Sequence, residues 1–332
     1  MVMSMKKPSA VRLPEGTVIR DRALHVLWVL FRTALLIGFA YVVLYPLLNM
    51  FSNAVRPVEE MFDPEVIWIP KTFTLDNIKT ALARMNILNP PFQNNAIVNT
   101  ILLDVVSALL QVAVTAMVGY GFARFSFKGR GVLFGIVILS IVVPVNSIVI
   151  PLYLTFQNFD FFGIGTLLQL ITGQKMTVSL IDTPYAFYLP ALLGQGIRSG
   201  LCIFIFRQFF RGMPRELEDA ASIDGCGSYR TFFRVFVPNA APPMLTTFIF
   251  SIVWYWNDYY YSTMFLPKRS TISISLSMLQ NVLNTDLTTR DPYVQFAVMQ
   301  AGALVSVIPL LIFYLIFQKH FTESVERTGI VG

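Results

Sequence analysis

Long uncharged stretches, separated by short charged segments, dominate the pattern of apolar and polar positions along this chain. A helix needs about 20 residues to cross about 30 Å of hydrocarbon. Runs of 19 to 29 residues without Asp, Glu, Lys or Arg occur at 33–55, 105–123, 131–159, 235–257 and 292–318. Between Asp182 and Arg207 the single charged residue is Arg198. The pattern therefore predicts six membrane-spanning helices, at roughly 28–55, 95–123, 131–158, 185–213, 242–266 and 294–318.

The composition agrees with a membrane protein. Of the 332 residues, 55% are hydrophobic and only 13% are charged, whereas soluble domains are about 25% charged. This balance excludes a disordered chain, a basic nucleic-acid-binding domain and a disulfide scaffold. We expect an all-α integral membrane protein with a tail at 1–27, a six-helix domain at 28–318 and a second tail at 319–332.

Lysine and arginine set the expected orientation. If the N-terminus is cytoplasmic, 15 of these residues fall in inside segments and 8 in outside segments. Cytoplasmic loops of membrane proteins carry the excess of positive charge, so we expect both termini on the cytoplasmic side of the cell membrane. The first apolar run is too long for a signal peptide and lacks a small-residue cleavage site, which predicts a retained first helix.

The residues needed for bond chemistry are scarce. The two histidines, His25 and His320, lie at opposite ends of the chain, and Cys202 and Cys226 are not grouped with them. This spacing predicts no metal site and no disulfide. A phosphate-binding G-x-x-x-x-G-K-[ST] loop is also absent, so nucleotide energy would come from another polypeptide. We expect a transport subunit without catalytic residues or a cofactor of its own.

One inside segment, 214–241, is long and patterned, and it lies between the fourth and fifth predicted spans. Pro214 suits a first helical turn, and the acidic 216–219 segment favours the positive end of the helix dipole. Gly225–Gly227 predicts a stop, because glycine adopts the left-handed conformation of a C-cap. The 232–236 segment places Phe on one face of a second helix. The pattern allows an amphipathic helix at the membrane surface or a docking helix whose alanines fit a groove on a soluble partner.

The same segment contains three short motifs, Asp219-Ala220-Ala221, Ile223-Asp224-Gly225 and Val237-Pro238. Their order resembles the cytoplasmic signature loop of permease subunits in binding-protein-dependent ABC importers. The family motif has Glu in place of Asp219. The resemblance implies a coupling helix that seats in a cleft of the ATPase subunit. The residues implied for this contact are Glu216, Glu218, Asp219, Ala220, Ala221, Asp224 and Gly225.

Further motifs are similar to carbohydrate permeases of the maltose-permease type. They are the 120–130 segment YGFARFSFKGR, PVN at 144–146 with IPLY at 150–153, WNDY at 256–259 and ERTGIVG at 326–332. The resemblance covers roughly residues 28–332. It implies that this chain translocates a carbohydrate, with an oligosaccharide favoured by the C-terminal tail.

The resemblance also implies partners and a mechanism. A homologous permease would form a heterodimer with this chain. Two ABC ATPase subunits would bind ATP and Mg²⁺, and an extracytoplasmic binding protein would deliver the sugar. ATP-driven closure of the ATPases would rock the helices from an inward-open to an outward-open arrangement, the mechanism called alternating access. Membrane lipid would surround the assembly, and no nucleic acid is implied.

Arg198 is the clearest ionisable residue at membrane depth, where such a group indicates function by default. Glycines at 194, 196 and 200 predict a loosened helix around it. Arg198 is a candidate donor to sugar hydroxyls or to a carboxylate. The alternatives are a structural pair with Asp104 or Asp258, or a side chain that snorkels outward.

The fifth predicted span ends in an aromatic and polar run at 254–261. Sugars present C–H faces that pack on rings and hydroxyls that bond to amides and carboxylates. The substrate-path candidates are Arg198, Trp254, Trp256, Asn257 and Asp258. Aromatic residues also gather at membrane interfaces, so the tyrosines at 259–261 are equally consistent with a belt.

Other polar and proline positions carry structural predictions. Asn99 and Asn146 are expected to form interhelical hydrogen bonds. Pro144 and Pro151 are expected to kink the third span. The outside segment 56–93 contains Glu59, Glu60, Asp63 and Glu65, and it is either a contact for an external binding protein or a solvated loop.

Three competing functions remain open. An ion-coupled secondary transporter would need carboxylates near the midplane and usually an internal repeat. Asp104 and Asp258 instead fall toward the outer face, and the halves show no repeat. A membrane-embedded enzyme would need a constellation of reactive residues at one depth. An ABC permease for amino acids or phosphate is the third alternative, against which the WNDY segment favours a sugar.

Overall fold

The computed structural model describes residues 15–63, 69–87, 95–173, 176–286 and 289–329. The described residues form helices and no named strand. The helices before the loop segment are α1 (Glu15–Val55), η1 (Val58–Phe62), α2 (Asp76–Arg84), α3 (Ala96–Arg124), α4 (Arg130–Val142), α5 (Val145–Gln157), α6 (Ile164–Thr172), α7 (Tyr185–Leu192) and α8 (Ser199–Gly212). They are followed by α9 (Glu216–Ile223), α10 (Ser228–Thr231), the π-helix η3 (Phe232–Phe236), α11 (Val237–Asn239), α12 (Ala241–Trp256), α13 (Tyr260–Phe265), α14 (Ile272–Thr285) and α15 (Pro292–Gly329).

Three of the described helices are long and apolar enough to cross a membrane. They contain the segments Leu24–Val55, Ala96–Arg124 and Pro292–Lys319. Two bent pairs, α4 with α5 and the 228–239 helices with α12, raise the number of candidate spans among the described residues to five. The all-helical membrane architecture is therefore confirmed, while six spans remain a prediction.

The third predicted span is two helices rather than one. The segments Arg130–Val142 and Ser147–Gln157 meet at 103°. Val143 and Pro144 between them have extended backbone, with ψ of 125° and 134°. Proline disfavours helical geometry in the residue before it and cannot donate its own backbone hydrogen bond. Pro151 lies inside α5 without ending it, so the bend occurs at Pro144.

The fourth predicted span is also interrupted. α7 ends at Leu192 and α8 begins at Ser199. Gly194 and Arg198 both have left-handed backbone, with φ of +69° and +56°. The predicted loosening around Arg198 is thus a complete break, because a left-handed residue cannot continue an α-helix.

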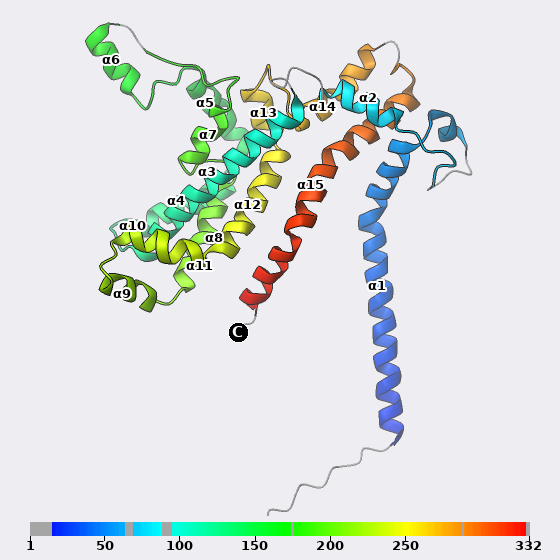
Figure 1. The fold of residues 1–332 in the computed structure, drawn as a ribbon, viewed down its shortest axis with the longest axis horizontal. Coiled ribbons are helices and arrows are strands. Elements are labelled where there is room, and N and C mark those ends of the chain that lie inside the picture. The colour runs from blue at the N-terminus through cyan, green and yellow to red at the C-terminus, as the bar shows by residue number, and fades with distance from the viewer. Residues whose placement is uncertain (1–14, 64–68, 88–94, 174–175, 287–288, 330–332) are drawn as a thin grey trace, which may run out of the picture.

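α3 is the central helix of the bundle and packs against α7, α8 and α12 (Figure 1). Gly119 allows the closest approach of α3 to α8. A Cβ atom at position 119 would lie 2.6 Å from the Cβ atom of Phe206. Small residues permit this separation between membrane helices.

α1 stands away from the bundle for most of its length (Figure 1). It approaches α15 at the end of the molecule where η1, α2 and α14 lie, and the two helices diverge toward the other end. None of its most apolar 18-residue window is buried. A surface this large and apolar is covered by lipid or by another subunit. We call η1, α2 and α14 the cap.

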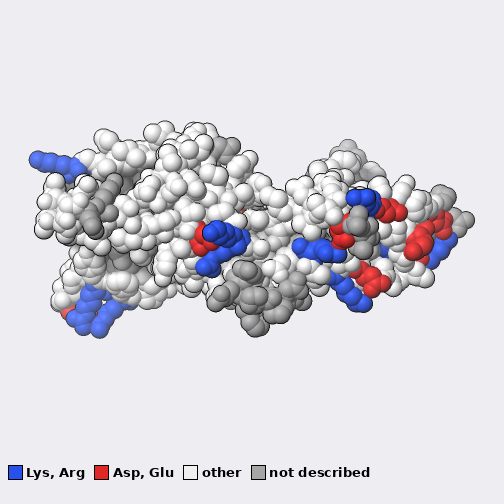
Figure 2. All heavy atoms as spheres, turned by 90° about the horizontal axis from the view of Figure 1, so that it is seen from above, with Lys and Arg blue, Asp and Glu red and all other residues white. Residues whose placement is uncertain are grey.

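Seen from the cap end, most of the surface carries no charged atoms (Figure 2). Acidic and basic side chains of both signs gather over the part formed by η1, α2 and the neighbouring end of α1.

Candidate functional site

The 214–241 segment folds into two short helical sections around a glycine turn, as the sequence predicts. α9 ends at Ile223, and Gly225 follows with φ of +73°. The Cys226 amide donates to the Ala221 carbonyl at 2.9 Å and closes the turn. The chain then continues through α10, η3 and α11 to α12. The loop lies at the opposite end of the molecule from the cap (Figure 1).

The second section is anchored by a cluster of aromatic rings. Tyr120 near the end of α3 contacts Phe232 and Phe236, with ring centroids 5.0 and 4.8 Å apart. Phe210 of α8 packs on the same two rings, and its side chain is fully buried. Phe232 and Phe236 of the predicted apolar stripe therefore face α3 and α8, whereas Phe233 is 57% exposed.

Arg124, the last residue of α3, joins the loop to the bundle. Its Nη2 donates to the Met213 carbonyl at 2.6 Å, and its Nη1 lies 3.5 Å from the Glu218 carboxylate. Its guanidinium also lies 4.9 Å from the centre of the Phe236 ring. The Arg124 side chain is 5% exposed, and one residue thus contacts both helical sections and the end of α8. From the sequence, Arg124 was singled out only as part of the 120–130 motif.

The residues implied for ATPase contact divide between two faces of α9. Ala221 is buried, and Glu218 turns toward Arg124. The exposed members are Glu216, Asp219, Ala220, Asp224 and Gly225. Two large side chains outside the set of implied contact residues are also exposed here, Ile223 at 86% and Tyr229 at 76%.

A second group of polar and aromatic residues lies at the break between α7 and α8. The Arg198 guanidinium lies 5.3 Å from the centre of the Trp254 indole of α12. Phe250 stacks on Trp254, with centroids 5.7 Å apart. Asn257, one further turn along, is exposed. Positions 250, 254 and 257 share one face of α12 because they are spaced by four and three residues.

The other two substrate-path candidates are engaged in contacts within the chain. Trp256 is 7% exposed, and its indole N–H donates to the Ser306 carbonyl of α15 at 3.1 Å. The Asp258 carboxylate accepts from the Ser262 amide at 2.8 Å and from the Ser262 hydroxyl at 3.0 Å. Trp256 therefore joins α12 to α15, and Asp258 caps the start of α13.

Gln111 is the centre of a buried polar network that the sequence analysis did not identify. Its amide donates to the Ile197 carbonyl at 2.9 Å and to the Ser251 hydroxyl at 3.2 Å, while its oxygen accepts from the Tyr255 hydroxyl at 2.8 Å. A Cβ atom on Gly196 would lie 2.4 Å from both Gln111 Oε1 and the Tyr255 oxygen. These contacts hold the broken segment against α3 and α12.

Asp104 and Arg198 do not meet. Within the described part of the chain, no ion pair joins Arg198 to Asp104 or to Asp258. Asp104 is 2% exposed, and both of its carboxylate oxygens lack a hydrogen-bond partner among the described residues. The structural pair considered for Arg198 is replaced by its contact with Trp254.

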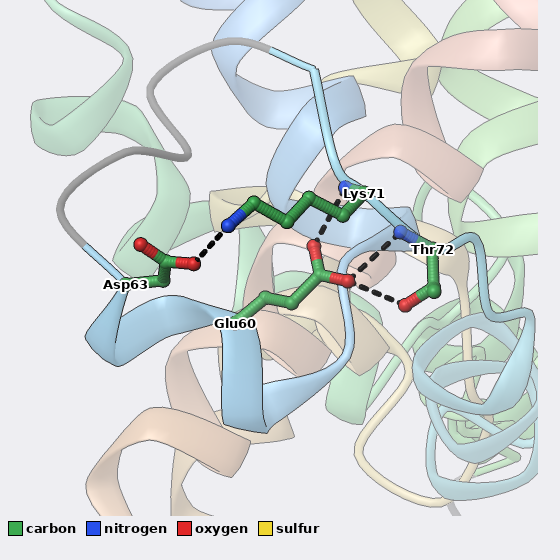
Figure 3. Close-up of polar contacts among 4 residues, drawn as sticks. All are labelled: Glu60, Asp63, Lys71 and Thr72. Atoms are coloured by element: carbon green, nitrogen blue, oxygen red, sulfur yellow. Dashed lines mark hydrogen bonds and ion pairs between the residues drawn. The ribbon is translucent and has the colours of Figure 1, made fainter.

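Acidic residues in the cap form internal contacts (Figure 3). The Glu60 carboxylate accepts from the amides of Lys71 and Thr72, both at 2.8 Å, and from the Thr72 hydroxyl. Lys71 Nζ pairs with Asp63 at 2.6 Å. The Thr72 hydroxyl is the main cause that lowers the pKa of Glu60, partial desolvation opposes it, and the two amides and the charge of Arg56 add to the lowering. We call these contacts the Glu60 clip.

Other predicted residues have separate outcomes. Asn99 Nδ2 of α3 donates to the Ser270 carbonyl at 3.1 Å. Ser270 lies between α13 and α14, so the bond joins a helix to a connecting segment rather than two helices. Glu59 is exposed. Glu65, the Asn146 side chain and the tail from Glu326 lie outside what the structure describes in side-chain detail. No group of three metal-ligating side chains occurs among the described residues, where both cysteines are free.

Comparison with protein families places the chain in a family of transport proteins. Residues 111–327 match the family described as "binding-protein-dependent transport system inner membrane component". This segment contains the 214–241 loop, the break at Arg198 and all of α12.

Individual relatives cover nearly the whole chain. The arabinooligosaccharides transport system permease protein AraQ of Halalkalibacterium halodurans is 27% identical over 90% of this chain and 96% of its own length. The trehalose transport system permease protein SugB of Mycobacterium tuberculosis is 28% identical over 90% and 95%. A crystal structure of a bacterial ABC transporter involved in the import of the acidic polysaccharide alginate shares the fold, with a TM-score of 0.65 at 20% identity, covering 91% of this chain and 98% of that chain.

Proposed function

The chain belongs to the family of binding-protein-dependent transport system inner membrane components, and from this premise we propose that it is the permease subunit through which an ABC importer passes a carbohydrate. The observation that carries the proposal is the exposed face of the α9 turn, which lies at one end of the bundle in a chain whose sequence contains no phosphate-binding loop. The relatives' names favour saccharides, with arabinooligosaccharides, trehalose and diacetylchitobiose among them.

The substrate path would run along the exposed face of α12. Arg198, Trp254 and Asn257 supply a cation, a ring and an amide within one short stretch. Rings cover the C–H faces of a sugar, and amide or guanidinium groups bond to its hydroxyls. Trp256 and Asp258 would act on this path indirectly, by fixing α12 against α15 and α13.

The energy would enter through the loop. ATPase subunits that bind ATP and Mg²⁺ would press on the exposed part of α9, around Asp219, Ala220 and Gly225. Arg124 would transmit that displacement to α3, since it contacts Met213, Glu218 and Phe236 together. α3 in turn packs on both halves of the broken span.

The remaining parts of the assembly are proposals of the same kind. A homologous permease would complete the path and cover the exposed apolar face of α1, and an extracytoplasmic binding protein would deliver the sugar at the cap end. Both termini and the loop would be cytoplasmic, with six spans between the tails.

A pull-down from detergent-solubilised membranes tests the energy source. We compare the wild type with Gly225→Asp. The matched control is Gly212→Asp, because both glycines have open space around the position of a Cβ atom but only Gly225 has a positive φ. We expect the ATPase to co-purify with the wild type and with the control, and to be lost at least tenfold with Gly225→Asp at equal membrane level.

Two outcomes would count against the proposal. An ATPase that never co-purifies would remove the assumed energy source and favour an ion-coupled secondary transporter. An ATPase that co-purifies equally with all three forms would show that the α9 turn is not the docking surface.

A further inference from the structure

A pocket of about 400 Å³ opens in the cap, and neither Arg198 nor any residue of α12 lines it. It lies between the end of α1, η1 and the start of α15. The residues that line it are Asn53, Arg56, Met61, Pro292, Tyr293 and Phe296. This volume is within the range of small-molecule sites in proteins, about 300–1,000 Å³.

The floor of the pocket is polar and buried. Arg56 and Asn53 are each only 7% exposed, although they sit at the end of an apolar helix. Arg56 Nη2 donates to the Ser52 hydroxyl at 3.0 Å, and Asn53 Nδ2 donates to the Asn49 carboxamide at 3.0 Å. These bonds hold both side chains against α1 where they line the pocket.

The wall of the pocket is aromatic. Tyr293 and Phe296 are each 45% exposed, so their rings are partly available to a ligand. Phe62 packs on Tyr293 with centroids 4.2 Å apart and supports that ring from the η1 side. Exposed rings beside a few directed polar groups match the chemistry of a sugar, which has C–H faces and a rim of hydroxyls.

The pocket is also held in shape without a ligand. The Glu60 clip pins η1 to the segment at 71–72 (Figure 3). Asn77 of α2 donates to the Arg56 carbonyl at 2.8 Å, and the Thr74 amide donates to the Val55 carbonyl at 2.8 Å. A preformed site loses less entropy when it binds.

We propose that this pocket is a saccharide-binding subsite that holds one sugar ring at the outer mouth of the permease before the sugar enters the path. The proposal rests on the carbohydrate function proposed above and adds a second, separate contact point. It assigns Tyr293 as the ring platform and Arg56 as the hydroxyl-bonding group.

Sugar uptake and direct binding by the intact transporter test the subsite. Uptake of trehalose, diacetylchitobiose and arabinotriose by cells that contain the complete transporter first identifies a transported sugar. The variants are Tyr293→Leu and Arg56→Gln, with Tyr293→Phe as the variant that keeps the ring. Phe73→Leu is the matched control, since Phe73 is an aromatic residue of the same region, 68% exposed and outside the pocket.

We expect Tyr293→Leu to raise the KM for uptake about three- to tenfold, the size of one lost aromatic contact. Tyr293→Phe and Phe73→Leu should keep the wild-type KM at equal membrane level. In saturation-transfer NMR on the purified transporter in nanodiscs, Tyr293→Leu and Arg56→Gln should weaken the signal of the same sugar.

Three outcomes would overturn the subsite. Wild-type uptake with an unchanged KM and NMR signal in the pocket variants would refute the subsite alone. A raised KM with an unchanged NMR signal and weaker co-purification of the external binding protein would make the pocket a protein contact. If the wild type imports and binds none of the three sugars, the proposed carbohydrate function fails and the subsite with it.

Discussion

Arg124 illustrates how one side chain can connect a docking surface to a bundle. Its charge is buried, and hydrogen bonds to charged groups contribute about 1.5–3 kcal/mol each. Its partners lie on α8, α9 and η3, three elements that are otherwise joined by short turns. The exposed part of α9 has no contact with Arg124 and should dock without it.

We therefore expect Arg124→Gln to separate docking from transport. The ATPase should co-purify as with the wild type, while sugar uptake at an equal rate of ATP hydrolysis falls about tenfold, the effect of about 1.4 kcal/mol. The measurement is uptake and ATP hydrolysis by the complete transporter in proteoliposomes.

Lys128→Gln is the control for this prediction, because Lys128 is an exposed cation four residues away. It should leave both activities unchanged. Two results would show that Arg124 does not transmit the movement. One is loss of the ATPase from the Arg124→Gln transporter, and the other is wild-type sugar uptake per ATP hydrolysed in that variant.

At single residues, the sequence predicted conformation better than contact. The glycines around Arg198 predicted a loosened helix, because glycine and left-handed backbone go together. Gln111 was missed, since one amide in an apolar run has no pattern that marks it as a hub. The WNDY segment placed Trp256 on the substrate path, but residues two positions apart in a helix point about 200° apart. Only the packing of α12 shows that Trp254, rather than Trp256, lies on the more exposed face.

At the scale of elements, the Glu60 clip links the shape of the cap to pH. The pKa of Glu60 is lowered in the folded chain, chiefly by the hydrogen bond from the Thr72 hydroxyl. A group with a lowered pKa stabilises the fold fully above its unfolded pKa, about 4.3 for Glu, and this contribution is lost as the pH falls through the folded value. The clip should thus be intact at neutral pH and open in acid.

Hydrogen exchange at 69–75 measures this opening. After correction for intrinsic exchange rates, we expect the protection of the Lys71 and Thr72 amides to fall as the pH drops from about 4.3, the unfolded pKa of Glu, to about 3. Glu60→Gln should have low protection throughout this range, and Glu59→Gln, in which the clip is untouched, should follow the wild type. If amide protection in Glu60→Gln falls with pH as it does in the wild type, a group other than Glu60 controls the opening of the clip.

The secondary structure of the loop was predictable from sequence, whereas the geometry of the spans was not. Pro214, the acidic first turn and Gly225 are local signals. α9 ends before Gly225 as predicted, but it begins at Glu216, so Pro214 precedes the helix instead of lying in its first turn. Pro144 predicted a kink, but its size of 103° depends on what α4 and α5 pack against. α5 contacts α13, an element more than 100 residues later in the chain, and no local signal specifies that contact.

For the whole molecule, α1 presents a large apolar surface that the described part of the chain does not cover. Its apolar residues are exposed along nearly their full length, and it meets α15 mainly near the cap. The amount of apolar surface was evident from the sequence, as was a membrane location. Which helices cover one another was not, because hydropathy is the same for a face against lipid and a face against another subunit.

The two broken spans decide the topology, and cysteine labelling can show whether each of them crosses. The probes are Glu59→Cys, Lys128→Cys and Gln169→Cys, each at an exposed position, together with the native Cys226. Cys202 is fully buried and should remain unlabelled in every form.

With a membrane-impermeant maleimide, six spans predict that positions 59 and 169 react in spheroplasts and that positions 128 and 226 react only in inverted vesicles. The order follows because one span lies between each successive pair of probes: α3, then α4 with α5, then α7 with α8.

If α4 and α5 form a re-entrant pair, position 169 reacts from the same side as position 128. If α7 and α8 do so, Cys226 reacts from the side of position 169, and the loop cannot meet a cytoplasmic ATPase.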